Sequence, residues 1–228
     1  MGALLLLAMV LPVQGQTQTT LDGVYNNSQA QRGARVYRNI CSHCHEGGEP
    51  DADPLFGPDF IDRWREAPLS FLHGFFSRNM PGDEPGTLKD SEYLDVLAFL
   101  LKENGYPAGS ANLSVEQLTQ IQLVTDAGPQ PMPANALVRV VGCLIDNKGD
   151  VALQQAALPH RVRRADEYTD NELALSTQEA LGSGSYSLRN AEPDLAGHKV
   201  QVKGVWVPSG SGISLTVLSL EDTGLMCQ

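Results

Sequence analysis

The period of the hydrophobic pattern changes once along the chain, close to residue 135. Up to that point apolar residues recur every three or four positions, which is the spacing of one face of a helix. Beyond it, short runs rich in Val, Leu and Ile alternate with polar residues, which is typical of half-buried strands. The pattern predicts a helical unit followed by a β unit.

Three segments of the first half have the helical period. Residues 28–45 form the first, with Ser28 as its expected N-cap. Proline, glycine and aspartate are frequent in residues 46–62, which predicts a loop. A second helix is expected at 68–78 and a third at 91–105, each ending at proline and glycine. The apolar faces of these two helices are Leu69, Leu72, Phe75 and Phe76, and Tyr93, Leu94, Leu97, Leu100 and Leu101.

Residues 110–134 are expected to connect the two units, first as a short helix and then as a stiff, extended Pro-rich spacer. Five strands are expected in the β unit, residues 135–228, a number typical of a small sheet or a partly open barrel. Residues 161–184 are expected to be an insertion with a short helix around 169–174. The strand-like runs are ALVRVVGCLI, VALQQAAL, SYSLRNA, HKVQVKGVWV and GISLTVLSL.

The chain has 228 residues, which suits one large or two small domains, and its net charge is −11. Phosphate binding needs a basic patch, so this acidity argues against nucleic acid as a partner and is explained by solubility. The main basic cluster is LPHRVRR, residues 158–164. It could dock an acidic partner, but a solvated strand edge is the simpler interpretation.

An apolar run at residues 3–13 is too short to cross a bilayer as a helix. Small and polar residues follow it, as in a secretory signal peptide, although the usual positive n-region is missing. We therefore expect residues 1–16 to be a signal peptide, with a buried N-terminal helix as the alternative. Export would place the protein in the bacterial periplasm or outside the cell, where disulfides form, and no transmembrane span is expected.

The strongest chemical signal is the motif CSHCH, in which Cys41 and Cys44 stand two residues apart and His45 follows directly. Two thiols at this spacing match the two vinyl groups of a haem, and the histidine can then bind the iron. A zinc site would need a second Cys/His pair nearby, and a redox dithiol would want a βαβ context. The motif favours one covalent haem c over zinc, a dithiol or chance.

Residues 27–109 resemble a class I c-type cytochrome. The resemblance rests on QRGARVYRNICSHCH, on RNMPG and on SEYLDVLAFLLKENGYPAG. The last stretch is similar to cytochromes that partner pyrroloquinoline-quinone (PQQ)-dependent dehydrogenases. Residues 135–228 resemble, more weakly, an OB-like barrel. The implied fold has two domains, an all-α cytochrome c haem domain followed by an all-β OB-like small barrel.

The resemblance implies that Cys41 and Cys44 hold the haem and that His45 is the proximal iron ligand. It also implies Met80, directly after the second helix, as the sixth ligand, with His73 as the alternative. A thioether ligand stabilises Fe(II) and raises the reduction potential, which suits an electron carrier.

Further residues around the haem are implied in the same way. In such cytochromes a proline carbonyl usually accepts a hydrogen bond from the proximal imidazole, and Pro54 or Pro58 could supply it. Trp64, Arg63 and Arg65 could hydrogen-bond a haem propionate, although the two arginines could equally lie in solvent.

The first and last helices of such cytochromes cross closely. Gly33 and Tyr37 are implied at this crossing, with Tyr93 opposite. Glycine lets two backbones approach, and aromatic rings fill the space beside it.

Two cysteines remain after haem attachment. Cys143 lies in the first expected strand and Cys227 is the penultimate residue. In an exported protein a disulfide between them is expected, which would tie the C-terminus to that strand. Two free buried thiols are the alternative.

Together these features predict an exported monohaem cytochrome that carries single electrons and is not an enzyme. Its donor would be a periplasmic dehydrogenase, of the PQQ type or another, and its acceptor another cytochrome or a terminal oxidase. The β domain would serve for docking. The alternatives are a haem subunit fixed in a larger oxidoreductase complex and a peroxidase-like enzyme with an open iron site.

Overall fold

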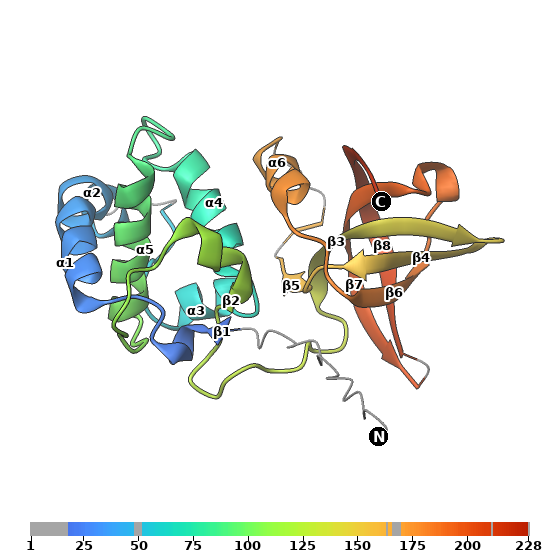
Figure 1. Ribbon diagram of the computed structural model, residues 1–228, viewed down its shortest axis with the longest axis horizontal. Coiled ribbons are helices and arrows are strands. Elements are labelled where there is room, and N and C mark those ends of the chain that lie inside the picture. The colour runs from blue at the N-terminus through green and yellow to red at the C-terminus, as the bar shows by residue number, and fades with distance from the viewer. Residues whose placement is uncertain (1–17, 48–51, 163, 166–169, 211, 228) are drawn as a thin grey trace, which may run out of the picture.

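The computed structural model shows a helical unit beside a unit built from strands (Figure 1). The expected signal peptide at residues 1–16 lies outside the described residues. The described residues are 18–47, 52–162, 164–165, 170–210 and 212–227.

In its described residues the helical unit contains five α-helices, and the first of them leads directly into the CSHCH motif. After α1 the chain continues through a π-helical turn into α2. A parallel pair of very short strands, β1 and β2, joins the beginning of the unit to its end. The bounds are α1 (Asn27–Val36), the π-helical turn (Tyr37–Cys41), α2 (Ser42–His45), α3 (Pro58–Trp64), α4 (Leu69–Asn79), α5 (Asp90–Glu103), β1 (Gln18–Thr19) and β2 (Ile121–Gln122), with 3-10 helices at Thr20–Asp22 and Val115–Gln120.

Two local features differ from the sequence prediction. The side chain of Asn26, not that of Ser28, caps α1 by accepting a 2.9 Å hydrogen bond from the Gln29 amide. The predicted loop at 46–62 ends early because α3 begins at Pro58. Gly57 adopts a positive φ of 83°, which glycine tolerates, and proline suits the first helical turn.

The crossing of α1 and α5 depends on Gly33. A Cβ atom at Gly33 would lie 1.8 Å from the Asp95 carbonyl oxygen, so only glycine allows this approach. Beside it the Tyr37 ring contacts the Phe99 ring, with centroids 5.0 Å apart. The expected partner, Tyr93, instead contacts Phe76 on α4, because its position on α5 faces away from α1.

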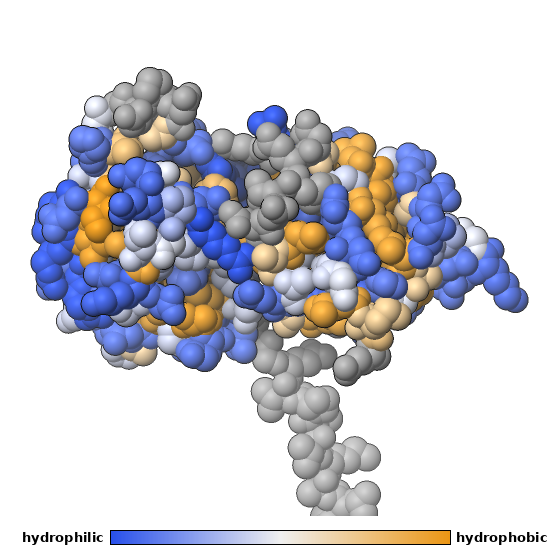
Figure 2. All heavy atoms as spheres, turned by 90° about the horizontal axis from the view of Figure 1, so that it is seen from above, coloured by the Kyte–Doolittle hydropathy of each residue, from blue (hydrophilic) through white to orange (hydrophobic). Residues whose placement is uncertain are grey.

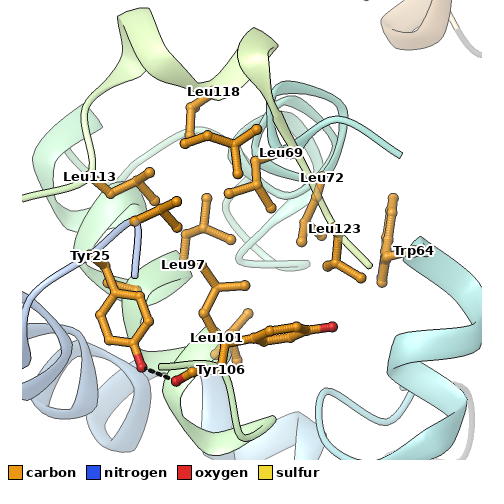
Figure 3. Packing of buried hydrophobic residues seen from close by; sticks show 14 of the residues in the cluster. Tyr25, Trp64, Leu69, Leu72, Leu97, Leu101, Tyr106, Leu113, Leu118 and Leu123 are labelled. Carbon is orange, nitrogen blue, oxygen red and sulfur yellow. Dashed lines mark hydrogen bonds between the residues drawn. The ribbon is translucent and has the colours of Figure 1, made fainter. Parts of the chain in front are cut away.

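The core of the helical unit extends past the expected end at residue 109. Leu97 and Leu101 of α5 face α4, and Leu113, Leu118 and Leu123 of the following segment pack onto the same cluster (Figure 3). These three leucines are fully buried. The expected connection at 110–134 therefore belongs in large part to the helical unit, and the predicted short helix is the 3-10 helix Val115–Gln120.

The described part of the β unit contains the five predicted strands and one short additional strand, β5. The pairing runs from β3 to β4, β6, β8 and β7, and β7 pairs again with β3. Among the strands described in this unit, β6 and β8 are the one parallel pair. Inward-facing residues such as Val140, Val202 and Leu215 form a second core. The bounds are β3 (Leu137–Asn147), β4 (Asp150–Ala156), β5 (His160–Arg161), α6 (Asp170–Gln178), β6 (Gly184–Arg189), β7 (His198–Ser209) and β8 (Gly212–Met226).

The predicted disulfide is confirmed. Cys143 of β3 and Cys227, directly after β8, are bonded to each other. The bond ties the last strand to the first strand of the unit.

The two units meet along a seam that includes part of the basic cluster. His160 is completely buried, and its ring centroid lies 4.2 Å from that of Phe71 on α4. Arg161 forms an ion pair with Asp62 of α3 at 3.2 Å. The interpretation as a solvated strand edge is therefore wrong for His160, whereas Arg161 lies on the edge strand β5 and stays partly exposed.

The face seen in Figure 2 is mostly hydrophilic and carries several separate apolar clusters, including a large one on the β half. Leu218 and Met226 of β8 are among the large apolar side chains that are exposed. None of the helices in the described residues is both long and apolar enough to span a bilayer.

We expect the double substitution Cys143→Ala with Cys227→Ala to lower the free energy of unfolding by about 4 kcal/mol, because the bond closes a long loop in the unfolded chain. The sequence separation of the two cysteines is 84 residues. Urea denaturation of oxidised wild type and of the variant measures this loss. A reducing agent should weaken the wild type and leave the variant unchanged, and equal midpoints without reductant would contradict the prediction.

We also expect the free energy of unfolding to decrease as the pH is lowered from about 6.5. Burial, together with the charges of Arg139 and Lys203, lowers the pKa of His160 well below its ordinary value of 6.5. The unfolded chain therefore binds a proton first as the pH falls, and stability is lost by up to about 1.4 kcal/mol per pH unit. Denaturation between pH 7.5 and 5 should show a shallower slope for His160→Gln than for wild type; equal slopes would contradict this.

Candidate functional site

The CSHCH motif and Met80 come from different parts of the chain and line the same cavity. The motif lies at the end of the helix that begins as α1, where the π-helical turn and α2 carry Cys41, Cys44 and His45. Met80 directly follows α4 as its C-cap residue. The fold therefore brings two thiols, an imidazole and a thioether together.

The cavity has a volume of about 550 Å³, which is within the usual range for sites that hold a small molecule or cofactor. Most of its wall is aliphatic or aromatic, so bound groups would be shielded from water. The lining residues contributed by helices α3, α4 and α5 are Phe60, Arg63, Trp64, Leu72, Phe75, Phe76, Tyr93, Val96 and Leu100.

His45 is held by a backbone acceptor. Its Nδ1 lies 2.9 Å from the carbonyl oxygen of Asp53, which suits an Nδ1–H donor and leaves Nε2 as the free lone pair. Burial lowers the pKa of His45, which favours the neutral ring that a metal needs. The predicted proline carbonyl is wrong: the acceptor is the residue before Pro54. Pro54 lines the cavity, whereas Pro58 begins α3 and does not.

Arg63 anchors the loop that supplies this acceptor. Its guanidinium donates to the Asp53 carboxylate and also lies 5.0 Å from the centre of the Trp64 ring. Trp64 is buried and lines the cavity, and Arg63 lines it as well. Their hydrogen bond to a haem propionate stays a prediction. Arg65 does not line the cavity and pairs with Asp62 at 3.0 Å.

The backbone of Met80 is fixed on both sides. Its amide donates to the Phe76 carbonyl at 2.9 Å, which closes α4. Its carbonyl accepts hydrogen bonds from the Tyr93 hydroxyl at 2.7 Å and from the Gly86 amide at 3.2 Å. The alternative ligand, His73, lies on α4 but is not among the residues that line the cavity.

The interpretation of the motif as a catalytic dithiol loses support. Burial, and next to it the charge of Cys44, raises the pKa of Cys41 to about 11, whereas a catalytic dithiol needs a lowered thiol pKa. Within the described residues, no three His, Cys, Asp or Glu side chains are grouped so that they could hold a metal ion.

The donor set fits a haem c. Two thiols and an imidazole with a free nitrogen are supplied by one short segment, and a thioether borders the same apolar cavity. Sequence reasoning missed Asp53, because its role comes from a backbone carbonyl that every residue type possesses.

Residues 28–100 match the family model described as cytochrome c oxidase, cbb3-type, subunit III. The match covers roughly a third of the chain and includes both the CSHCH motif and Met80. It supports a class I c-type cytochrome domain, and with it an electron-transfer haem protein. Comparison with curated proteins and with solved structures gives no match for this chain.

We expect Tyr93→Phe to lower the free energy of unfolding by about 1 kcal/mol, because it deletes the hydrogen bond to the Met80 carbonyl and keeps the ring. The carbonyl retains its bond from Gly86, which limits the loss. Urea denaturation measures the change. Tyr93→Leu also removes the ring contact with Phe76 and should cost more; a Phe variant as stable as wild type would show that the hydroxyl contributes nothing.

Proposed function

We propose that this protein is an exported monohaem c-type cytochrome that carries single electrons from a periplasmic dehydrogenase to another cytochrome or a terminal oxidase. The observation that carries the proposal is the cavity lined by Cys41, Cys44 and His45 together with Met80. A bound haem iron would supply a site that changes between Fe(III) and Fe(II).

Each of these residues has a defined role in the proposal. Cys41 and Cys44 would hold the haem as thioethers, and His45 would bind the iron through its free Nε2. The carbonyl of Asp53 fixes the ring orientation of His45 and increases its basicity. Met80 would supply a second side-chain ligand to the iron. Its thioether favours Fe(II), and the apolar wall keeps water away, so both raise the reduction potential.

Several parts of the proposal concern the chain beyond the haem. Residues 1–16 are proposed as a signal peptide, and the donor as a PQQ-type or related dehydrogenase. The β unit is proposed to be an OB-like small barrel, which is supported by the order of strand pairing that returns to β3. The exposed apolar side chains of Leu218 and Met226 support a docking role for this unit.

A second candidate is a haem subunit fixed in a larger oxidoreductase complex. The description of the matching family model, which names an oxidase subunit, favours this candidate. Native gel filtration of extracts separates the two: a free carrier elutes at the mass of one small protein, whereas a fixed subunit elutes with its complex.

We expect the haem-loaded wild type to be low-spin and to show the weak far-red band of a Met–Fe(III) bond. Met80→Ala should abolish this band and raise the affinity of the ferric protein for imidazole by at least about tenfold, equivalent to ~1.4 kcal/mol. Absorption spectra and ligand titration measure both effects.

Met226→Ala is the matched control, because Met226 is 64 % exposed and lies in the β unit. Its spectrum should equal that of wild type. A wild type that is already high-spin would indicate an open iron site and overturn the carrier proposal. A wild type without covalent haem would overturn the assignment of Cys41 and Cys44.

A further inference from the structure

Helix α6 lies between α4 of the helical unit and the strands of the β unit (Figure 1). Buried polar side chains of strands β3 and β7 form hydrogen bonds with α6 and the residue that follows it. The guanidinium of Arg139 on β3, which is fully buried, donates to the Ser176 hydroxyl at 2.6 Å and to the Glu179 carboxylate at 2.8 Å. It also donates to the Gln201 side chain on β7. A buried charge with this many partners is held in one geometry.

Two lysines of β7 contact the two ends of α6. The Lys203 amine donates to the Glu172 carboxylate at 2.6 Å, and only 1 % of Lys203 is exposed. The Lys199 amine donates to the carbonyl oxygens of Thr177 and Glu179, at 2.9 and 2.6 Å. These carbonyls lie at and just after the end of α6, where a cation also interacts favourably with the helix dipole.

The opposite side of α6 packs against the helical unit. Leu175 is partly buried, packs against the core cluster of that unit and lies against Gly74, which is buried on α4. A Cβ atom at Gly74 would lie 2.2 Å from Cδ2 of Leu175, so the leucine occupies the space that any other side chain would need. Leu175 therefore fits into a notch in α4.

Phe71, three residues earlier on α4, makes the second contact across the seam. The Arg139 guanidinium lies 4.9 Å from the centre of its ring, and the His160 ring lies 4.2 Å from it. The Phe71 ring also lies 6.1 Å from that of Trp64, which lines the cavity. Contacts with the β unit thus lie next to the cavity wall.

The same helix supplies part of the haem site. Leu72, Phe75 and Phe76 of α4 line the cavity, and Met80 follows directly. Because the 11 residues of α4 form one continuous helix, a shift at Gly74 moves these side chains with it.

We propose that α6 and the sheet beneath it form a brace that fixes α4, so that Leu175 in the Gly74 notch is a positioning residue for Met80 on the iron. This inference rests on the proposed function and gives the β unit a role inside the molecule. Without the brace α4 has more freedom, the Met80 thioether is displaced more easily, and the reduction potential falls.

A size exchange at the notch tests the brace. Leu175→Ala leaves a hole, and Gly74→Ala places a methyl group where the leucine lies. We expect each to raise the affinity of the haem-loaded ferric protein for imidazole by roughly fivefold and to lower the reduction potential. The double variant refills the notch and should return both values towards those of wild type.

Leu181→Ala is the matched control, because Leu181 follows α6 and is 37 % exposed. It should behave as wild type. Gly74→Ala also changes the helix propensity of α4, which is why ligand affinity and potential are measured rather than stability alone. If Leu175→Ala fails to fold, Leu175→Val makes a smaller hole and should shift both values in the same direction.

The outcomes separate this inference from the proposed function. If the wild type lacks the Met–Fe(III) band, both the proposed function and the brace are contradicted. If the wild type shows the band but all variants keep its imidazole affinity and reduction potential, the brace is contradicted. The proposed function as an electron carrier then still stands. The brace is also contradicted if the effects of Leu175→Ala and Gly74→Ala on imidazole affinity and reduction potential simply add in the double variant.

Discussion

The close approach of α1 and α5 at Gly33 is the constraint on which the site depends. Any Cβ atom there would collide with the Asp95 carbonyl oxygen, at 1.8 Å. Because α1 leads through one turn into the CSHCH motif, its position against α5 decides where the thiols and His45 lie. The ion pair of Arg32 with the buried Asp95, 2.8 Å apart, links the two helices beside the glycine. Other residues of α5 form the cavity wall, so one crossing places two sides of the site.

The other side of the cavity depends on α4, which is placed differently. It has a side that lines the cavity and a side turned to the β unit, and Met80 directly follows it. Its outer contacts come from residues more than sixty positions further along the chain, Arg139, His160 and Leu175. One wall of the site is thus determined within the helical unit, and the other is shared between the two units.

Sequence patterns predicted the elements well where local physics dominates. The helix over α4 follows its apolar face, and the five strands follow their alternation. The thiols and His45 are a contiguous motif and were predictable from spacing alone. Asp53 was not, because it acts through its backbone. The early start of α3 was missed because the pair Gly57 and Pro58 is equally compatible with a loop and with the first residues of a helix.

The seam was the least predictable part for a physical reason. Arg139, Lys199 and Lys203 alternate with valines, which is the pattern of a strand with one face in water. In the structure that face is covered by α6, and each cation is matched by carboxylates or helix carbonyls. The alternation of polar and apolar residues shows only that one face of the strand is polar. It is the same whether water or a polar helix covers that face. The partner of those cations is an insertion with little amphipathic character of its own, so only the three-dimensional arrangement shows that the charges are buried.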